Sequence, residues 1–257
     1  IVAALFASGA QAIVEDGSAI VTHFPSTADL DRIRSAVRAA DARASISAAA
    51  VADEDWSVAW RSHVTAHHVG ALTIAPPWLA DSFDPASTIV IDPGMAFGTG
   101  DHASTRGVLR LLPGSLRAGD VVADVGSGSA VLSIAAAKLG ARRVYAIELD
   151  GEALSNAQAN VQANAVSDRV HLIHGDAFAL LALVAPIELM LANIISGVLE
   201  SLLPRMETSL TLRGRAILGG LLVSEREAFS ALLIARGWRI LDDCSEGDWW
   251  TVAIARS

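Results

Sequence analysis

Apolar and polar positions along the second half of the chain follow the pattern of a sheet flanked by helices. Short β-branched and apolar runs predict strands, at 121–125, 144–148, 170–174, 187–192, 216–218, 238–241 and 251–254. The Ala- and Leu-rich stretches between them predict helices, at 131–139, 151–164, 198–212 and 224–235. Strands that alternate with helices of about 10 to 15 residues indicate an α/β fold with a doubly wound, mostly parallel sheet.

The beginning of the chain has a different pattern, that of a small α+β domain. Apolar residues with helical spacing surround two short apolar runs, and the turn sequence Glu15-Asp16-Gly17-Ser18 separates those runs. The expected elements are a helix, a hairpin and a second helix, at 2–6, 12–21 and 30–40. The stretch that follows has no sustained period. We therefore predict a first domain, a linker and a main domain, at 1–57, 58–86 and 87–257.

Composition and charge narrow the class of protein. Of the 257 residues, 52% are hydrophobic and 18% are charged, which excludes a disordered chain. The longest stretch without Asp, Glu, Lys or Arg, 62–80, contains three His and two Pro, so no membrane span is expected. Cys244 is the only cysteine, which excludes an internal disulfide and suits the cytoplasm. The net charge of −9 disfavours nucleic acid and favours a basic protein partner.

A glycine-rich turn follows the first strand of the predicted sheet. Asp124 lies in that strand, Gly126 and Gly128 follow it, and Glu148 ends the next strand; all four are candidate cofactor-binding residues. The glycines allow a ligand to approach the backbone, and a carboxylate at Glu148 can accept hydrogen bonds from ribose hydroxyls. These residues are typical of a site for a cofactor that contains a nucleoside. NAD is one alternative, but the NAD-binding fingerprint needs Gly or Ala at the position where this chain has Val131. A tight turn without a ligand is a second alternative.

Another loop, 92–105, combines glycines, hydroxyl groups and an aromatic residue between an apolar run and a helix. Its backbone N–H groups and hydroxyls can bind a carboxylate or an amine, whereas the structural alternative is a plain connecting loop. Its candidate cofactor-binding residues are Phe97, Gly98, Thr99, Gly100 and Thr105.

Asn193 stands where the strand predicted at 187–192 meets its loop. An isolated Asn at such a position is commonly a turn or cap residue. However, the pattern Asp124-x-Gly126-x-Gly128 with an acidic residue at the end of the next strand is typical of S-adenosylmethionine-dependent methyltransferases. In that fold Asn193 would face the methyl donor, and its amide oxygen could hold an acceptor amine. We take Asn193 as the candidate catalytic residue. His63 and His67 have i, i+4 spacing but no carboxylate at the spacing of a zinc protease, so no metal site is expected.

Six segments of the chain resemble one family, the bacterial ribosomal-protein methyltransferases of the PrmA type, which trimethylate the eleventh large-subunit ribosomal protein. The most specific is DPGMAFGTGDHAST at 92–105. The others are DEDWSVAWR at 53–61, IAPPWL at 74–79, VVADVGSGSAVLSIAAAKLGARRVYAIELD at 121–150, LANIISGVL at 191–199 and ILGGLLVSE at 217–225. They stand in the same order as in the family and extend from Asp53 to the end of the chain.

The resemblance implies the fold of the class I S-adenosylmethionine-dependent methyltransferases, which is Rossmann-like, with S-adenosyl-L-methionine as the cofactor. The family's cofactor contacts fall on Thr105, Gly126, Glu148 and Asn193. The family usually has Asp at the position of Glu148 and Gly at that of Ala130. Its first domain docks the ribosomal protein, and here that domain is weakly matched and expected to be incomplete at its start.

The expected function is therefore methyl transfer to lysine or other amino groups of a basic ribosomal protein, by a protein expected to be a monomer. Two alternatives stay open: a methyltransferase with another protein or small-molecule acceptor, and a regulatory protein that binds S-adenosylmethionine without catalysis.

Overall fold

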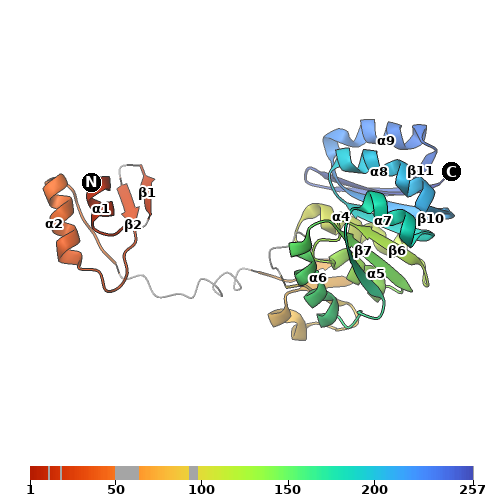
Figure 1. The fold of residues 1–257 in the computed structure, drawn as a ribbon, viewed down its shortest axis with the longest axis horizontal. Coiled ribbons are helices and arrows are strands. Elements are labelled where there is room, and N and C mark those ends of the chain that lie inside the picture. Colours follow the sequence, from red (N-terminus) through yellow and green to blue (C-terminus); the bar gives the residue numbers. More distant parts are fainter. Residues whose placement is uncertain (11, 18, 50–63, 93–97, 257) are drawn as a thin grey trace. The chain divides into compact units, whose positions relative to one another are not determined.

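The computed structural model describes residues 1–10, 12–17, 19–49, 64–92 and 98–256. The chain forms two compact units, Ile1–Ser62 and His63–Ser257, each described here by itself (Figure 1).

The first unit contains the predicted helices and hairpin. Its elements are α1 (Val2–Ala7), β1 (Ile13–Asp16), β2 (Ala19–Thr22) and α2 (Leu30–Ala40), with β1 and β2 antiparallel. The Asp29 side chain caps α2 by accepting hydrogen bonds from the N–H groups of Asp31 and Arg32. Four buried residues form a small core, Leu5, Ala10, Ile33 and Val37.

The second unit is built on a seven-stranded sheet. Its strands are β6 (Val121–Val125), β7 (Arg143–Glu148), β8 (Val170–His174), β9 (Ile187–Asn193), β10 (Leu210–Leu222), β11 (Trp238–Glu246) and β12 (Trp249–Arg256). Their order is β11-β12-β10-β9-β6-β7-β8. The pairs from β8 to β10 are parallel, and β12 is antiparallel to both β10 and β11. The prediction of a doubly wound, mostly parallel sheet is confirmed.

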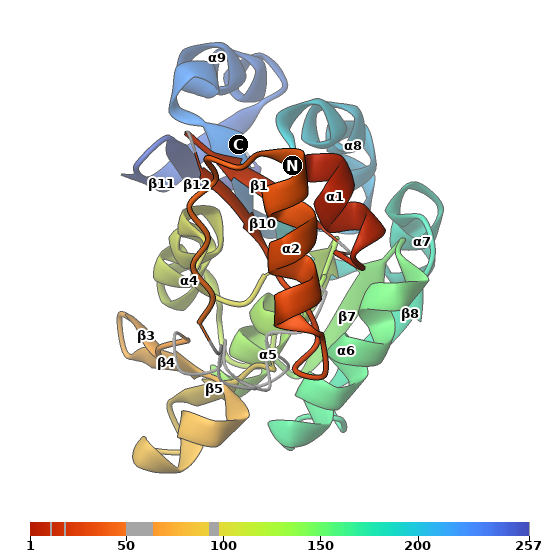
Figure 2. The same ribbon diagram turned by 90° about the vertical axis from the view of Figure 1, so that its left-hand side faces the viewer.

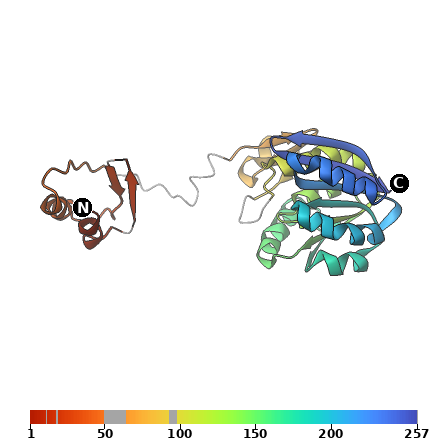
Figure 3. The same cartoon turned by 90° about the horizontal axis from the view of Figure 1, so that it is seen from above.

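Helices cover both faces of this sheet (Figure 3). The helices are α4 (Ala103–Ser115), α5 (Val131–Lys138), α6 (Gly151–Ala163), α7 (Ala177–Val184), α8 (Ser196–Ser209) and α9 (Arg226–Ala235). Alternate residues of β6 enter different cores. Val122 packs in a cluster with residues of α4, α5 and α6, whereas Ala123 packs in another with residues of α7, α8 and α9. Both faces of the strand are buried, which explains why all its residues except Asp124 are apolar.

A second sheet of this unit corrects the linker predicted at 58–86. It consists of β3 (His67–Val69), β4 (Leu72–Ala75) and β5 (Thr88–Val90), and a 3-10 helix, η2 (Pro77–Ser82), follows β4. The sheet packs on the side of α4 and α5 (Figure 2). These strands have only three or four residues each, which is too short for a periodic pattern to show. The part of the predicted linker at 64–86 therefore belongs to the second unit.

Three further differences concern single elements. Helix α7 was not predicted, because its eight residues are all apolar and no polar face sets a period. The predicted helix at 198–212 ends at Ser209, and β10 begins at Leu210. The strands predicted at 216–218 and 238–241 are the middle of β10 and the first part of β11.

Candidate active site

The predicted site residues gather at one edge of the seven-stranded sheet. The chain runs from β6 outward to β7 and β8 on one side, and β9 lies on the other side of β6. The strand order reverses between β6 and β9, and ligands of such sheets bind outside the carboxyl ends of the strands at that point. Glu148 is the last residue of β7 and Asn193 is the last residue of β9. The turn after β6 lies between them.

Glycine is required in this turn for conformation and for space. Gly126 has a φ of +69° and Gly128 a φ of +50°, in the left-handed region. A Cβ atom at Gly126 would lie 2.7 Å from Cγ2 of Ile194, the residue after Asn193. The turn after β6 and the loop after β9 are therefore in close contact.

Glu148 binds this turn to the end of β7. Its Oε2 accepts a hydrogen bond from the Gly128 N–H at 2.8 Å, and its Oε1 accepts one from the Asp150 N–H at 2.9 Å. Each carboxylate oxygen has two lone pairs, so each can accept one more hydrogen bond. Glu148 thus shapes the turn and keeps the capacity to accept hydrogen bonds from ribose hydroxyls.

The loop before α4 reaches the same turn. The hydroxyl of Ser129 donates to the carbonyl oxygen of Gly98 at 2.6 Å. Gly98 and Gly100 have φ values of +96° and +92°. The hydroxyl of Thr99 donates to Asp101 Oδ1 at 2.6 Å. Gly98, Thr99 and Gly100 therefore form a defined loop beside the glycine turn, whereas Phe97 lies outside the described residues.

Asn193 and Thr105 form the third contact between predicted site residues. Asn193 Nδ2 donates to the hydroxyl of Thr105 at 3.2 Å, and Thr105 is buried at the start of α4. Asn193 Oδ1 and the hydroxyl of Ser127 are also buried, and neither has a hydrogen-bond partner among the described residues. Buried polar atoms are rarely left without partners, so these two oxygens mark hydrogen bonds that the described residues leave unmade.

The adjacent strand fixes the position of the Asn193 side chain. Gly219 of β10 is the register partner of Asn193, and a Cβ atom there would lie 3.0 Å from Asn193 Oδ1 and 2.8 Å from Cγ2 of Val108. At Gly220, where φ is +76°, a Cβ atom would lie 2.5 Å from the carbonyl oxygen of Ile194. Two adjacent glycines therefore leave room for the end of β9.

Asp124 is buried and engages α5. The hydroxyl of Ser133 donates to Asp124 Oδ2 at 2.6 Å, and Oδ1 has no partner among the described residues. Burial raises the pKa of Asp124 to about 7, although the hydrogen bonds from Ser133 act in the opposite direction. The contacts of Asp124 brace the glycine turn against the following helix. Its role as a cofactor-binding residue stays a prediction.

Ala130 is the last residue before α5, and it adopts an unusual conformation. Its φ of +66° lies in the left-handed region, and its side chain is fully buried. This is the position at which the resembling family usually has Gly, and the backbone shows why, because a Cβ atom is strained in that region. The substitution leaves the turn intact: the Ala130 N–H donates to the Ser127 carbonyl at 2.8 Å.

A row of asparagines on α6 supports the site and was not predicted. Asn160 Nδ2 donates to the carbonyl of Ser129 at 3.0 Å, and its Oδ1 accepts from the Asp92 N–H at 2.9 Å. Asn164 makes a pair of hydrogen bonds with the backbone of Val90, at 2.9 and 2.6 Å. A sequence signal could have revealed these asparagines. They recur at i, i+4 spacing on a helix face that is otherwise apolar.

The histidines at 63–68, at which no metal site was expected, lie in the three-stranded sheet or outside the described residues. His67 and His68 are in β3, and His68 Nδ1 lies 3.0 Å from the hydroxyl of Thr73. His63 lies outside the described residues. Within the described ranges, no group of three or more His, Cys, Asp or Glu is placed to hold a metal ion. None of the helices in that part of the chain is long and apolar enough to span a membrane.

Comparison with known proteins gives concordant matches. A family model described as "Ribosomal protein L11 methyltransferase (PrmA)" matches residues 4–257. The ribosomal protein L11 methyltransferase of Synechococcus sp. (strain RCC307) is 39% identical over 210 residues, which cover 80% of this chain and 70% of that protein. The one from Thermus thermophilus is 37% identical over 207 residues, which cover 80% and 79%.

Solved structures agree. The ribosomal protein L11 methylase of Lactobacillus delbrueckii subsp. bulgaricus matches with a TM-score of 0.66 and 29% identity, covering 75% of this chain and 99% of that one. The precorrin-6y C5,15-methyltransferase of Geobacter metallireducens shares the fold, with a TM-score of 0.51 and 19% identity over 58% of this chain and 88% of that one. The resemblance seen in the six sequence segments is thus confirmed, and the chain belongs to the ribosomal protein L11 methyltransferase (PrmA) family.

Proposed function

We propose that this protein transfers methyl groups from S-adenosyl-L-methionine to lysine side chains of ribosomal protein L11. Family membership supports the reaction and the substrate. The observation that carries the proposal is the pair of buried, unsatisfied oxygens, Asn193 Oδ1 and Ser127 Oγ, at the point where the strand order reverses.

The residues at this edge fit the parts of the cofactor. The remaining lone pairs of Glu148 can accept hydrogen bonds from the ribose hydroxyls of the cofactor. The hydroxyl of Ser127 can form a hydrogen bond with another polar group of the cofactor. The loop at 98–100 and the Thr105–Asn193 pair suit the amino-acid part. Gly126 and Gly128 allow the cofactor to approach the backbone closely. Phe97 remains a candidate on the sequence motif.

The protein's contribution to the reaction is to orient the reactants. When bound, the cofactor would supply a methyl group on a sulfonium: the amine lone pair attacks the methyl carbon in line, the C–S bond breaks and a neutral thioether leaves. A lysine amine has a reference pKa of about 10.4 and must lose its proton before it can attack. Asn193 Oδ1 is an acceptor that can take a hydrogen bond from a neutral amine and so hold its lone pair in a fixed direction.

The charge of the chain suits this substrate. With 19 basic and 28 acidic residues, its formal net charge is −9, and acidic proteins attract basic partners over several ångströms. The small first unit would dock the ribosomal protein, as in the resembling family. We also propose that the protein acts as a monomer, in the cytoplasm, without direct contact with nucleic acid.

The test has two steps. The purified protein is first titrated calorimetrically with S-adenosylmethionine, and isotope-labelled cofactor is then incubated with ribosomal protein L11 from an unmethylated source. Binding and label on L11 lysines are expected. Binding without label on L11 but with label on another acceptor would move the substrate elsewhere. Binding without any transfer would favour a regulatory protein, and binding of NAD instead would contradict the cofactor.

The role of Asn193 is tested by Asn193→Ala. Loss of the oriented acceptor is expected to lower kcat by the order of 100-fold, as for other single positioned hydrogen-bonding groups. The matched control is Gln162→Ala, which removes an exposed amide from α6. Wild-type turnover and cofactor affinity in Asn193→Ala would contradict the assignment.

A further inference from the structure

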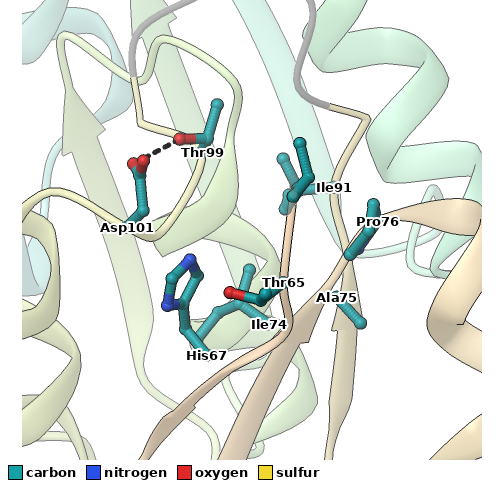
Figure 4. Close-up of a pocket in the computed structure, with 9 residues that line it drawn as sticks. Thr65, His67, Ile74, Ala75, Pro76, Ile91, Thr99 and Asp101 are labelled. Carbon is teal, nitrogen blue, oxygen red and sulfur yellow. Dashed lines mark hydrogen bonds between the residues drawn. The ribbon is translucent and has the colours of Figure 1, made fainter. Parts of the chain in front are cut away.

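A pocket lies at the carboxyl end of the three-stranded sheet (Figure 4). The residues described as lining it include none of the glycine turn. β4 and β5 are parallel, and the pocket is bordered by the residues that end them or follow them, Ala75, Pro76 and Ile91. β3 is antiparallel to β4, so Thr65 and His67 meet the same end. The hollow is small and partly open to solvent.

One wall of the pocket is polar and carries a negative charge. Asp101 and Thr99 line it from the loop before α4, and Thr65 and His67 line it from the start of β3 (Figure 4). The Thr99 hydroxyl donates to Asp101 Oδ1 and so fixes the carboxylate. Among the described residues, no basic side chain forms an ion pair with this carboxylate. Arg106 is the nearest in sequence, but it contacts the Asp101 backbone carbonyl and pairs with Glu246.

The other wall is apolar. Ile74, Ala75, Pro76 and Ile91 are all buried and contribute only hydrocarbon surface. An occupant that matches both walls has a flexible aliphatic chain and a cationic end that can donate several hydrogen bonds. A lysine side chain has these properties: its four methylenes suit the apolar wall, and its ammonium has three donors.

The same loop connects the pocket to the proposed cofactor site. Gly98 contacts the glycine turn through Ser129, whereas Thr99 and Asp101 line the pocket. Gly100 packs on Ile74, where a Cβ atom would lie 2.7 Å from Cγ2. The loop is therefore held on both sides, and a lysine in the pocket would lie beside the cofactor loop and not at Asn193.

We infer that this pocket is a docking subsite for a lysine of the protein substrate, other than the lysine that receives the methyl group. The inference rests on the proposed function and adds a determinant of substrate choice to it. An anionic side chain is disfavoured by Asp101, and a purely apolar one would leave the polar wall without partners.

The test is a titration of the full-length, ¹⁵N-labelled protein with Nα-acetyl-lysine methylamide, followed by NMR. The amide signals of Thr65, Thr99 and Asp101 are expected to shift at ligand concentrations of the order of 10 mM, as for a single side chain without its protein. The matching norleucine derivative, which lacks the ammonium, is expected to bind at least about fivefold more weakly. Equal binding of both compounds, or no shift of these signals, would overturn the subsite.

Variants assign the effect to the pocket. Asp101→Asn keeps the shape and removes the charge, and it is expected to weaken binding of the lysine derivative about fivefold. Asp168→Asn removes an equivalent charge from an exposed position and is expected to leave binding unchanged. Thr65→Val is a second variant, outside the loop before α4, and it is expected to weaken binding of the lysine derivative less than Asp101→Asn does. Thermal melting of each variant confirms that it is folded. Unchanged binding in folded Asp101→Asn and Thr65→Val would refute the proposal.

Four further outcomes test the inference, and the last two separate it from the proposed function. If saturation with S-adenosylmethionine abolishes the lysine-induced shifts, the pocket is part of the cofactor site and the inference is wrong. If L11 is methylated, Asp101→Asn is expected to raise KM for L11 about fivefold without weakening cofactor binding. Methylation of L11 without any binding of the lysine derivative overturns the subsite only. Binding of the derivative by a protein that does not methylate L11 overturns the proposed function and leaves a lysine pocket with another partner.

Discussion

At the scale of single residues, the site is defined by polar groups held in apolar surroundings. Asp124 is the clearest case, because burial raises its pKa to about 7 from 3.8. The folded protein therefore retains a proton that the unfolded chain releases between about pH 4 and pH 7. Over that window the stability contributed by this group is lost as the pH rises.

Asp124→Asn is expected to remove this dependence. Between pH 4 and pH 7 the variant should gain stability relative to wild type, by the order of 4 kcal/mol at the upper end, since each pKa unit corresponds to about 1.4 kcal/mol. The measurement is the free energy of unfolding in urea at several pH values. Asp168→Asn, which has the same change in net charge, serves as the control. If the free energy of unfolding changed with pH in the same way for wild type and Asp124→Asn, the raised pKa of Asp124 would be contradicted.

Ala130 gives a second prediction at this scale. Its left-handed backbone costs about 1 kcal/mol, but its buried methyl group contributes a similar amount, so Ala130→Gly should change stability by less than about 1 kcal/mol. Ala130→Val adds a branched side chain to a filled, left-handed position and should lose at least about 2 kcal/mol. Urea unfolding of both variants tests this. A Val variant as stable as the Gly variant would show that the turn relaxes.

At the scale of elements, α6 holds the three-stranded sheet through its asparagines. Asn164→Ala would leave the N–H and C=O of Val90 without their side-chain partners and should cost about 2 to 3 kcal/mol. The Val90 amide should then exchange its hydrogen faster. The control is Gln162→Ala, which removes an exposed amide from the same helix. Similar losses in both variants would mean that the contact with Val90 is not the cause.

Elements with a clear period or clear boundaries could be predicted from the sequence. β6 and β7 are mostly apolar runs between polar turns, and the rule for parallel strands then places Gly126, Glu148 and Asn193 at one edge. Helix α7 could not be predicted because it has no polar face, and the strands around Gly70 are too short to show alternation. The tertiary contacts of the asparagines on α6 span more than 60 residues, and no local pattern encodes such a distance.

At the scale of the whole molecule, the two units differ in the size of their cores. Among the described residues, the first unit buries four apolar side chains, whereas the second contains two extensive clusters. A unit of about 60 residues with so small a core is marginally stable on its own. We expect the amides of α2 to exchange on the order of 100-fold faster than those of β6, after correction for intrinsic rates. Hydrogen exchange by mass spectrometry measures this, and equal protection would mean that the units unfold together.

Gly219 and Gly220 affect how the results of mutagenesis should be interpreted. Neither has a side chain that could touch a ligand, yet the first leaves room for Asn193 Oδ1 and the second for the Ile194 carbonyl. In a saturation scan scored by activity, both positions would tolerate replacement as poorly as Asn193 itself. Inspection of ligand contacts alone would rank them as neutral, so a library designed to change acceptor preference should hold this pair of glycines constant.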